Sequence, residues 1–218
     1  LLAEQAEALC TAGLKRLNIS LDGLSEETFE KIARRPGLDK VLAGIRVAQQ
    51  LPFEKIRLNA VAIAGLSEQE IVPLGRFARE EQLELRFIEF MPLDADKSWS
   101  DGAVVGRDEI VARIDAEMPL EPIESNYAGE VALRYRYRDG SGEIGIIASV
   151  TKPFCGDCTR VRISPEGKFF TCLFSNKGTD LREILRVGAT DQEIESTIRK
   201  VWMKREDRYS ERRASLTN

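Results

Sequence analysis

The sequence of 218 residues contains no histidine and only four cysteines. The missing imidazole excludes Ser-His-Asp and Cys-His catalysis, histidine proton shuttles and every metal site that requires a histidine ligand. Any chemistry must therefore use thiolate, carboxylate, lysine, arginine or tyrosine groups, or a cofactor. Four cysteines in a chain of this length, without a secretory signal, also argue against a disulfide-stabilised scaffold.

Long apolar runs and a strong net charge are absent as well. No apolar run approaches the roughly eighteen residues of a membrane span, and no signal-peptide pattern opens the chain, so we expect a cytoplasmic protein without a membrane partner. The 36 acidic residues outnumber the 32 basic ones, which does not predict a nucleic-acid partner. The hydrophobic content of 43% suffices for one large domain or two modest ones.

The first half of the sequence alternates strand-like and helical segments. Apolar runs predict strands at 16–23, 56–65 and 83–93. Helical patterns lie at 25–34, 38–51 and 67–82, with Ser25 and Ser67 as expected caps. Near-continuous apolar strands between helices predict a parallel sheet covered by helices. Either a barrel or an open doubly wound sheet fits that order, and the chain length favours part of a barrel.

The pattern changes after about residue 93. A helix is predicted at 107–118, an irregular segment at 120–132, and then two hairpins with turns at Asp139-Gly140 and at 164–167. Two helices at 181–188 and 191–206 follow. The predicted fold class is therefore α/β, with part of a (βα) TIM-type barrel at residues 1–105 and a smaller β-hairpin and helix module at residues 106–218.

Side chains at the carboxyl ends of the predicted strands are candidates for ligand binding, because parallel barrels place their functional groups at this end. They are Ser20, Asp22, Asn59, Glu89 and Met91. Each also has an ordinary structural explanation, such as a turn, a backbone hydrogen bond or core packing.

Three of the four cysteines lie within one short segment. Cys155 and Cys158 form a CxxC pair, and a predicted hairpin returns Cys172 to the same neighbourhood. Three interpretations stay open on spacing alone. The first is a zinc site with a fourth ligand such as Cys10 or Asp157. The second is a redox CxxC pair, which leaves Cys172 unexplained. The third is an iron–sulfur cluster with one open iron, where a substrate nitrogen or oxygen could bind.

Basic residues surround this cysteine segment. Arg160 and Arg162 alternate along one predicted strand, so they should project from the same face. Lys152, Lys168 and Lys177 lie close by in sequence. Guanidinium groups suit phosphate oxygens and the carbonyl edge of a purine, so the segment predicts an anionic ligand; a solvated basic strand is the ordinary alternative.

The cysteine segment "KPFCGDCTRVRISPEGKFFTCLF" (152–174) resembles the C-terminal cluster motif of the MoaA family. These proteins are the radical-SAM GTP 3′,8-cyclases of molybdenum cofactor biosynthesis. Further segments are similar to the family in the same order: "LNISLDGLSEETFEKI" (17–32), "IRLNAVAIAGLSEQEI" (56–71), "LRFIEFMPL" (85–93) and "WMKREDRYSERR" (202–213).

The resemblance implies a lyase, GTP as substrate and several site residues. Cys155, Cys158 and Cys172 would hold a [4Fe–4S] cluster, and Arg160, Val161 and Arg162 would bind GTP. Ser20 and Met91 would contact S-adenosyl-L-methionine, and Arg57, which stands where the family has lysine, would also contact GTP. No side chain is carried over as a catalytic acid or base.

The resemblance also implies features beyond these residues. The full-length family protein carries a second [4Fe–4S] cluster on an N-terminal CxxxCxxC and a C-terminal Gly-Gly tail, and neither is present in this sequence. We therefore expect a fragment that is inactive as a cyclase on its own. The resemblance also implies partners: a second copy of the chain in a homodimer, and a cyclic pyranopterin monophosphate synthase that acts in the same pathway.

Overall fold

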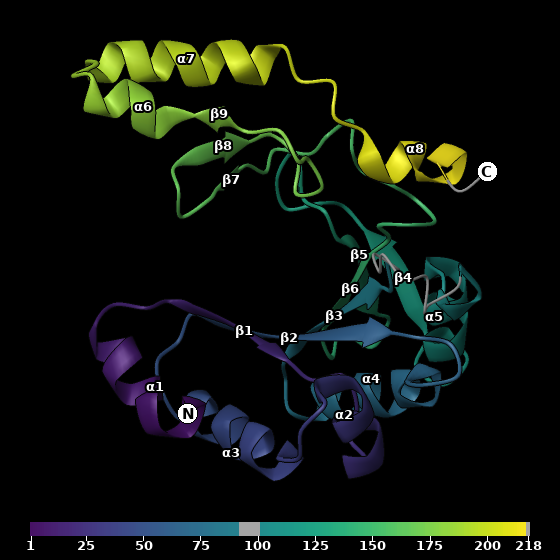
Figure 1. Ribbon diagram of the computed structural model, residues 1–218. Helices are drawn as coiled ribbons and strands as arrows, with labels where there is room; N and C mark the ends of the chain where they lie inside the picture. Colours follow the sequence, from purple (N-terminus) through teal and green to yellow (C-terminus); the bar gives the residue numbers. More distant parts are fainter. Residues whose placement is uncertain (92–100, 217–218) are drawn as a thin grey trace. The chain divides into compact units, whose positions relative to one another are not determined.

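The computed structural model describes residues 1–91 and 101–216. Its contacts divide the chain into two compact parts, unit 1 (Leu1–Lys152) and unit 2 (Pro153–Asn218), shown in Figure 1. The predicted functional boundary at 105/106 does not coincide with this division, because strands after residue 106 pair within the sheet of unit 1. A functional division at 105/106 stays a prediction.

Unit 1 is built on a six-stranded sheet with the order β1-β2-β3-β6-β5-β4. The neighbours β1, β2, β3 and β6 run parallel, whereas β5 and β4 are added antiparallel. The strands are β1 (Arg16–Ser20), β2 (Lys55–Ala62), β3 (Glu84–Glu89), β4 (Leu120–Ile123), β5 (Leu133–Tyr137) and β6 (Glu143–Ile147).

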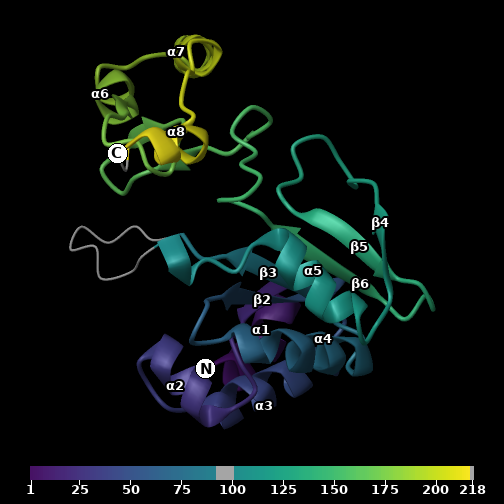
Figure 2. The same cartoon turned by 90° about the vertical axis from the view of Figure 1, so that its right-hand side faces the viewer.

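The described helices of unit 1 gather on one side of this sheet, as Figure 2 shows for α4 and α5. They are α1 (Leu2–Thr11), α2 (Glu26–Ala33), α3 (Leu38–Gln49), α4 (Ile71–Glu80) and α5 (Arg107–Asp115), with short 3-10 turns η1 (Glu68–Glu70) and η2 (Asp101–Ala103). Among these described helices, none is long and apolar enough to span a membrane, and the same holds for those of unit 2.

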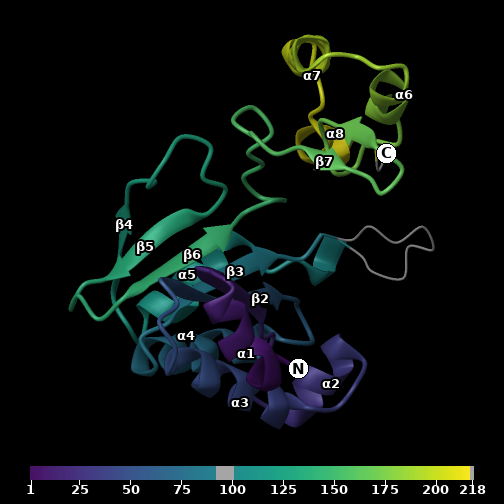
Figure 3. The same cartoon turned by 90° about the vertical axis from the view of Figure 1, so that its left-hand side faces the viewer.

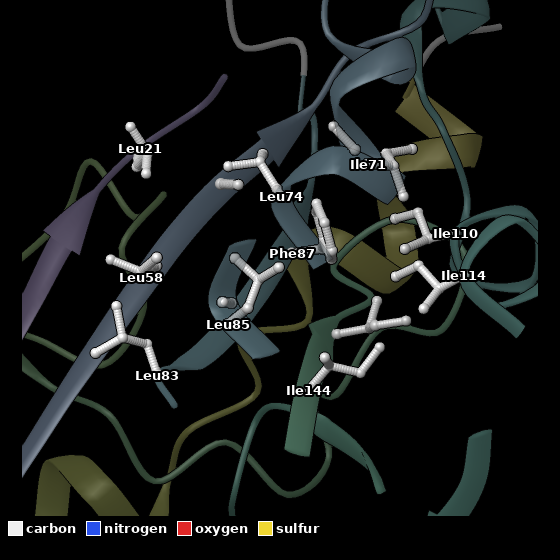
Figure 4. Close-up of a cluster of buried hydrophobic side chains, with 14 of the residues drawn as sticks. Leu21, Leu58, Ile71, Leu74, Leu83, Leu85, Phe87, Ile110, Ile114 and Ile144 are labelled. Carbon is white, nitrogen blue, oxygen red and sulfur yellow. The ribbon is translucent and has the colours of Figure 1, made fainter. Parts of the chain in front are cut away.

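The core of unit 1 lies between the sheet and these helices. Alternate residues of β2 and β3 face it, among them Leu58, Leu85 and Phe87, which pack with Leu74 of α4 and Ile114 of α5 (Figure 4). Burying each such side chain stabilises the fold by roughly 1.5–3 kcal/mol. Because the inward positions are apolar, the polar residues between them must lie on the opposite face of the sheet.

Unit 2 contains a small antiparallel sheet, β7-β8-β9, labelled in Figure 1, and the helices α6, α7 and α8, which are also labelled in Figure 3. Its elements are β7 (Arg162–Ile163), β8 (Lys168–Phe170), β9 (Thr179–Asp180), α6 (Leu181–Arg186), α7 (Asp191–Met203) and α8 (Tyr209–Leu216). The hairpin of β7 and β8 closes on a turn in which Gly167 has a φ of +80°. Asp180 caps α6, and Thr190 and Glu193 form a capping box on α7.

The predicted α/β class with a mainly parallel sheet is confirmed, and both predicted hairpins are present. The barrel stays a prediction. The third predicted strand, 83–93, ends at Glu89, and its last two positions lie outside the described residues. Ser67 stands at the N-cap position of η1, but its hydroxyl makes no capping bond: it accepts a hydrogen bond from Ile63 N at 3.0 Å and donates to Val61 O at 2.8 Å.

Candidate functional site

One pocket of unit 2 brings together the predicted cysteines and arginines. Cys155, Cys158 and Cys172 line it, together with Arg160 and Arg162. The cavity measures about 40 Å³, against the roughly 10–15 Å³ that a single ordered water needs. It therefore has room for a small inorganic group, and a nucleotide bound there would extend out of it.

Local structure explains how the three thiols reach this pocket. The CxxC residues form a tight turn, in which Cys158 N donates to Cys155 O at 3.4 Å. The β7-β8 hairpin then reverses the chain, so that Cys172 follows the end of β8. All three thiols are free and partly exposed. The hairpin return predicted from the sequence brings the third thiol to the pocket that the first two also line.

Arg160 acts directly on one of these thiols. Its guanidinium lies over the Phe154 ring, 4.9 Å from the centroid, and its Nε donates to Cys158 Sγ at 3.4 Å. Burial raises the pKa of the Cys158 thiol, but the hydrogen bond and charge of Arg160, together with the charge of Arg205, outweigh burial and lower this pKa overall. The thiolate, which is the form that binds metal, is therefore favoured at this position.

The thiol set fits a soft metal or an iron–sulfur group in chemistry and in placement around one pocket. The three thiols are not gathered around one position. In the part of the chain that the structure describes, no three cysteine or acidic side chains lie close enough together to hold a metal ion. Of the alternative fourth ligands considered, Cys10 lies on α1 of unit 1, and Asp157 lies inside the CxxC turn.

The Arg162 side chain makes fewer interactions than that of Arg160 among those that the structure describes. Its Nη1 donates to the carbonyl of Val161 at 2.8 Å, a contact with its immediate neighbour in the chain. Both residues are exposed. The Arg162 side chain lines the pocket beside the thiols, where its remaining N–H groups can meet an anionic or carbonyl-bearing ligand.

In unit 1, the predicted ligand residues Ser20 and Arg57 share the sheet face away from the helices. Ser20 pairs in register with Asn59, and Arg57 lies two residues before Asn59 on the same face of β2. Among the described residues, none donates a hydrogen bond to the buried Asn59 Oδ1. Asn59 therefore adds an acceptor to this face, in register with Ser20 on the neighbouring strand.

Arg57 belongs to a charged cluster on this face. Glu84 accepts from Arg57 Nε at 2.8 Å and from Arg86 Nε at 2.9 Å, and it also pairs with Lys55. Burial raises the pKa of Glu84, but the hydrogen bond from Lys55 and the three positive charges outweigh it and lower this pKa. Arg86 also forms an ion pair with Glu130, with its Nη2 3.6 Å from Glu130 Oε1.

The remaining candidates at the carboxyl ends of the strands differ in their roles. Asp22 Oδ1 accepts from Val61 N at 2.8 Å, and the Glu89 carboxylate is buried, with Arg107 N, Val150 N and Thr151 N donating to it at 2.8 Å. These two carboxylates hold backbone in place. Met91 follows β3 and is half-buried.

Sequence reasoning missed the C-terminal residues of the pocket, which include Arg205, Asp207 and Tyr209. They lie more than thirty residues after Cys172, so no local pattern connects them with the thiols. The segment 202–213 was identified only by its family resemblance, and that similarity was the available signal.

Comparisons with known proteins agree along the whole chain. The family model described as Molybdenum Cofactor Synthesis C matches residues 83–211, and the model described as Radical SAM superfamily matches residues 1–78. Similar curated proteins are the GTP 3′,8-cyclases of Acidothermus cellulolyticus (47% identical over 98% of this chain), Xanthomonas campestris (43% over 100%) and Staphylococcus carnosus (37% over 100%). The chain spans 60% to 64% of the length of these relatives.

Proposed function

Because the chain belongs to the MoaA family of radical-SAM proteins in molybdenum cofactor biosynthesis, we propose that it forms the substrate-binding part of a GTP 3′,8-cyclase. The reaction would join C3′ of the GTP ribose to C8 of its guanine, with S-adenosyl-L-methionine as the radical source. The product would pass to a cyclic pyranopterin monophosphate synthase.

The pocket of unit 2 carries this proposal. It combines three thiols with three arginines, Arg160, Arg162 and Arg205, which is the donor set for a metal group beside an anionic nucleotide. A [4Fe–4S] cluster held by Cys155, Cys158 and Cys172 would supply an open iron as a Lewis acid for a nitrogen or oxygen of guanine. Arg160 would hold the Cys158 thiolate, and Arg162 would bind the nucleotide.

The sheet face of unit 1 that lies away from its helices supports the second half of the proposal. Ser20 and Met91 would contact S-adenosyl-L-methionine at the carboxyl ends of their strands, and Arg57 would bind GTP phosphate in exchange for Glu84. We propose that this sheet belongs to a barrel. The chemistry of such a site is mainly the positioning of two substrates, which requires no histidine acid or base.

The proposal is tested by metal analysis of chain purified under anaerobic conditions. About four irons with matching sulfide per chain are expected. One zinc per chain without iron would contradict the proposal and would support a zinc-stabilised module.

GTP binding tests the arginine pair. Replacement of both Arg160→Ala and Arg162→Ala should weaken GTP binding at least about tenfold, because each lost hydrogen bond to a charged group is worth about 1.5–3 kcal/mol. The matched control is Arg182→Ala with Arg199→Ala. These two arginines of unit 2 pair with Asp180 and Glu195 and do not line the thiol pocket. Unchanged GTP affinity in the first double variant would refute the assignment.

A further inference from the structure

The segment from Arg205 to Glu211 contacts both cysteine-bearing stretches of unit 2. Arg205 donates from Nη1 to Cys158 O and from Nη2 to Cys155 O, the latter at 3.2 Å. The hydroxyl of Thr171, the residue before Cys172, donates to Asp207. Glu211 Oε1 accepts from Gly156 N at 3.2 Å, inside the CxxC turn. These contacts connect residues 36 to 55 positions apart in the sequence.

The Arg205 guanidinium is fixed by these contacts. Its plane lies over the Trp202 ring, 4.5 Å from the centroid, and both terminal nitrogens donate to backbone carbonyls. A planar fork with two parallel donors matches two carbonyl oxygens, which a lysine ammonium cannot reproduce. Arg205 therefore differs from Arg162, whose side-chain hydrogen bond within the described residues goes to its own neighbour, Val161.

These bonds connect the backbone segments that carry the three thiols. The carbonyls of Cys155 and Cys158 converge on one guanidinium, so Arg205 sets the geometry of the CxxC turn. The bond from Thr171 to Asp207, two residues after Arg205, ties the Cys172 strand end to the same segment. An aromatic contact between Phe174 and Tyr209, with centroids 4.4 Å apart, fixes the chain just beyond Cys172.

We propose that Arg205 is a positioning residue for the three-thiol site, and that the segment Arg205–Glu211, here called the brace, holds the CxxC turn and the Cys172 strand end in register. The brace deepens the proposed function, since it acts on the group that the thiols would hold. Partners behind metal ligands orient those ligands, and losing such a partner commonly costs about 10–100-fold in metal affinity. The permanent charge of Arg205 beside the thiolates would also raise the reduction potential of a bound cluster.

The test compares four variants of the chain after anaerobic reconstitution with iron and sulfide. Arg205→Met should bind metal about 10–100-fold more weakly, measured by release to a chelator. Arg205→Lys should recover part of this affinity, and Arg205→Gln, which is neutral, should give a cluster with a more negative midpoint potential than the parent chain. The control Arg199→Met removes an exposed arginine of α7 and should change neither property.

Two further measurements keep the outcomes separate. Thr171→Val removes the hydroxyl that binds Asp207 and should weaken metal binding even if Arg205→Met fails to fold. If the parent chain takes up zinc and no iron, the proposed function fails, but zinc affinity in the same variants still tests the brace. Metal affinity and midpoint potential in Arg205→Met and Arg205→Gln equal to those of Arg199→Met would overturn the brace.

Discussion

At the scale of single residues, Asp22 shows how a carboxylate can hold backbone at an energetic cost. It receives the N–H of Val61 and so joins the carboxyl end of β1 to β2, beside Ser20. Burial raises its pKa, and the hydrogen bond from Val61 offsets this only in part. The charged form is therefore less stable in the folded protein than in the unfolded chain.

Asp22→Asn should remove this cost, because the amide oxygen can still accept from Val61 N. A raised native pKa means that the folded state binds the proton more tightly. The contribution of Asp22 to stability is therefore fully present below the ordinary value of 3.8 and is lost as the pH rises through the native value. As the pH rises from 3.8 through the raised native pKa, the unfolding free energy of Asp22→Asn should therefore increase relative to that of the parent chain. Urea denaturation of both proteins at several pH values measures this difference.

The exposed carboxylate of Asp39 provides the control for this experiment, since Asp39→Asn also removes one negative charge from unit 1. If the stability difference between the parent chain and Asp22→Asn stays constant with pH, the assigned role of burial at Asp22 is wrong.

Residue by residue, the sequence predicted the thiols and arginines of the pocket better than the residues that support them. Cys155, Cys158 and Cys172 were found because a turn and a hairpin connect them locally. Arg205 could not be found in this way, because its bonds to the CxxC turn span 47 and 50 positions. The binding roles of the predicted residues stay predictions.

At the scale of elements, the turn between β7 and β8 depends on a glycine for two reasons. Gly167 has a φ of +80°, and a Cβ at this position would lie 2.8 Å from Arg182 Cβ, where α6 begins. A side chain here would therefore strain the backbone and collide with the helix. Gly188, between α6 and α7, also has a positive φ of +86°, but a Cβ there would meet nothing within 4 Å.

These two glycines form a matched pair. Gly188→Ala should cost about 1–2 kcal/mol of unfolding free energy, for the left-handed backbone alone. Gly167→Ala should cost about 1–3 kcal/mol more, because the collision adds to the strain. Amide hydrogen exchange of the β7 and β8 residues measures the difference, and equal costs for the two variants would count against the collision.

Elements with clear periodicity were predicted, and the exceptions have physical reasons. The alternation of apolar positions gave β2 and β3 and the helices between them. Strand β4 was predicted as irregular, because its Glu121-Pro122 sequence is unfavourable for a strand and tolerated at the edge position that β4 occupies. The two-residue β9 is too short to show a period.

At the scale of the whole molecule, the two units differ in how much apolar surface they bury. Among the side chains that the structure describes, Phe169 and Leu181 are the buried apolar ones of unit 2, whereas the large cluster shown in Figure 4 belongs to unit 1. Small domains with few buried apolar side chains commonly depend on a metal or another crosslink. The thiolate–metal bonds of the proposed cluster would provide one for unit 2.

Removal of one thiol should consequently loosen unit 2 and leave unit 1 intact. Cys172→Ser should lose metal and raise amide exchange throughout 153–216, while amides of β2 and β3 keep their protection. Hydrogen-exchange mass spectrometry resolves the two units. Cys10→Ser, which changes the cysteine on α1, is the control and should retain the metal. Unchanged exchange in unit 2 of Cys172→Ser would contradict a metal-dependent fold.

The charged cluster on the sheet face away from the helices has a kinetic consequence. Lys55, Arg57 and Arg86 supply three cations, and the carboxylates that pair with them are Glu84 and Glu130, so these five groups together carry one positive charge. The electrostatic field of the cluster would attract a polyphosphate toward this face before any contact forms. Its association rate should therefore fall as ionic strength rises, while its dissociation rate, set by contacts already made, should change far less.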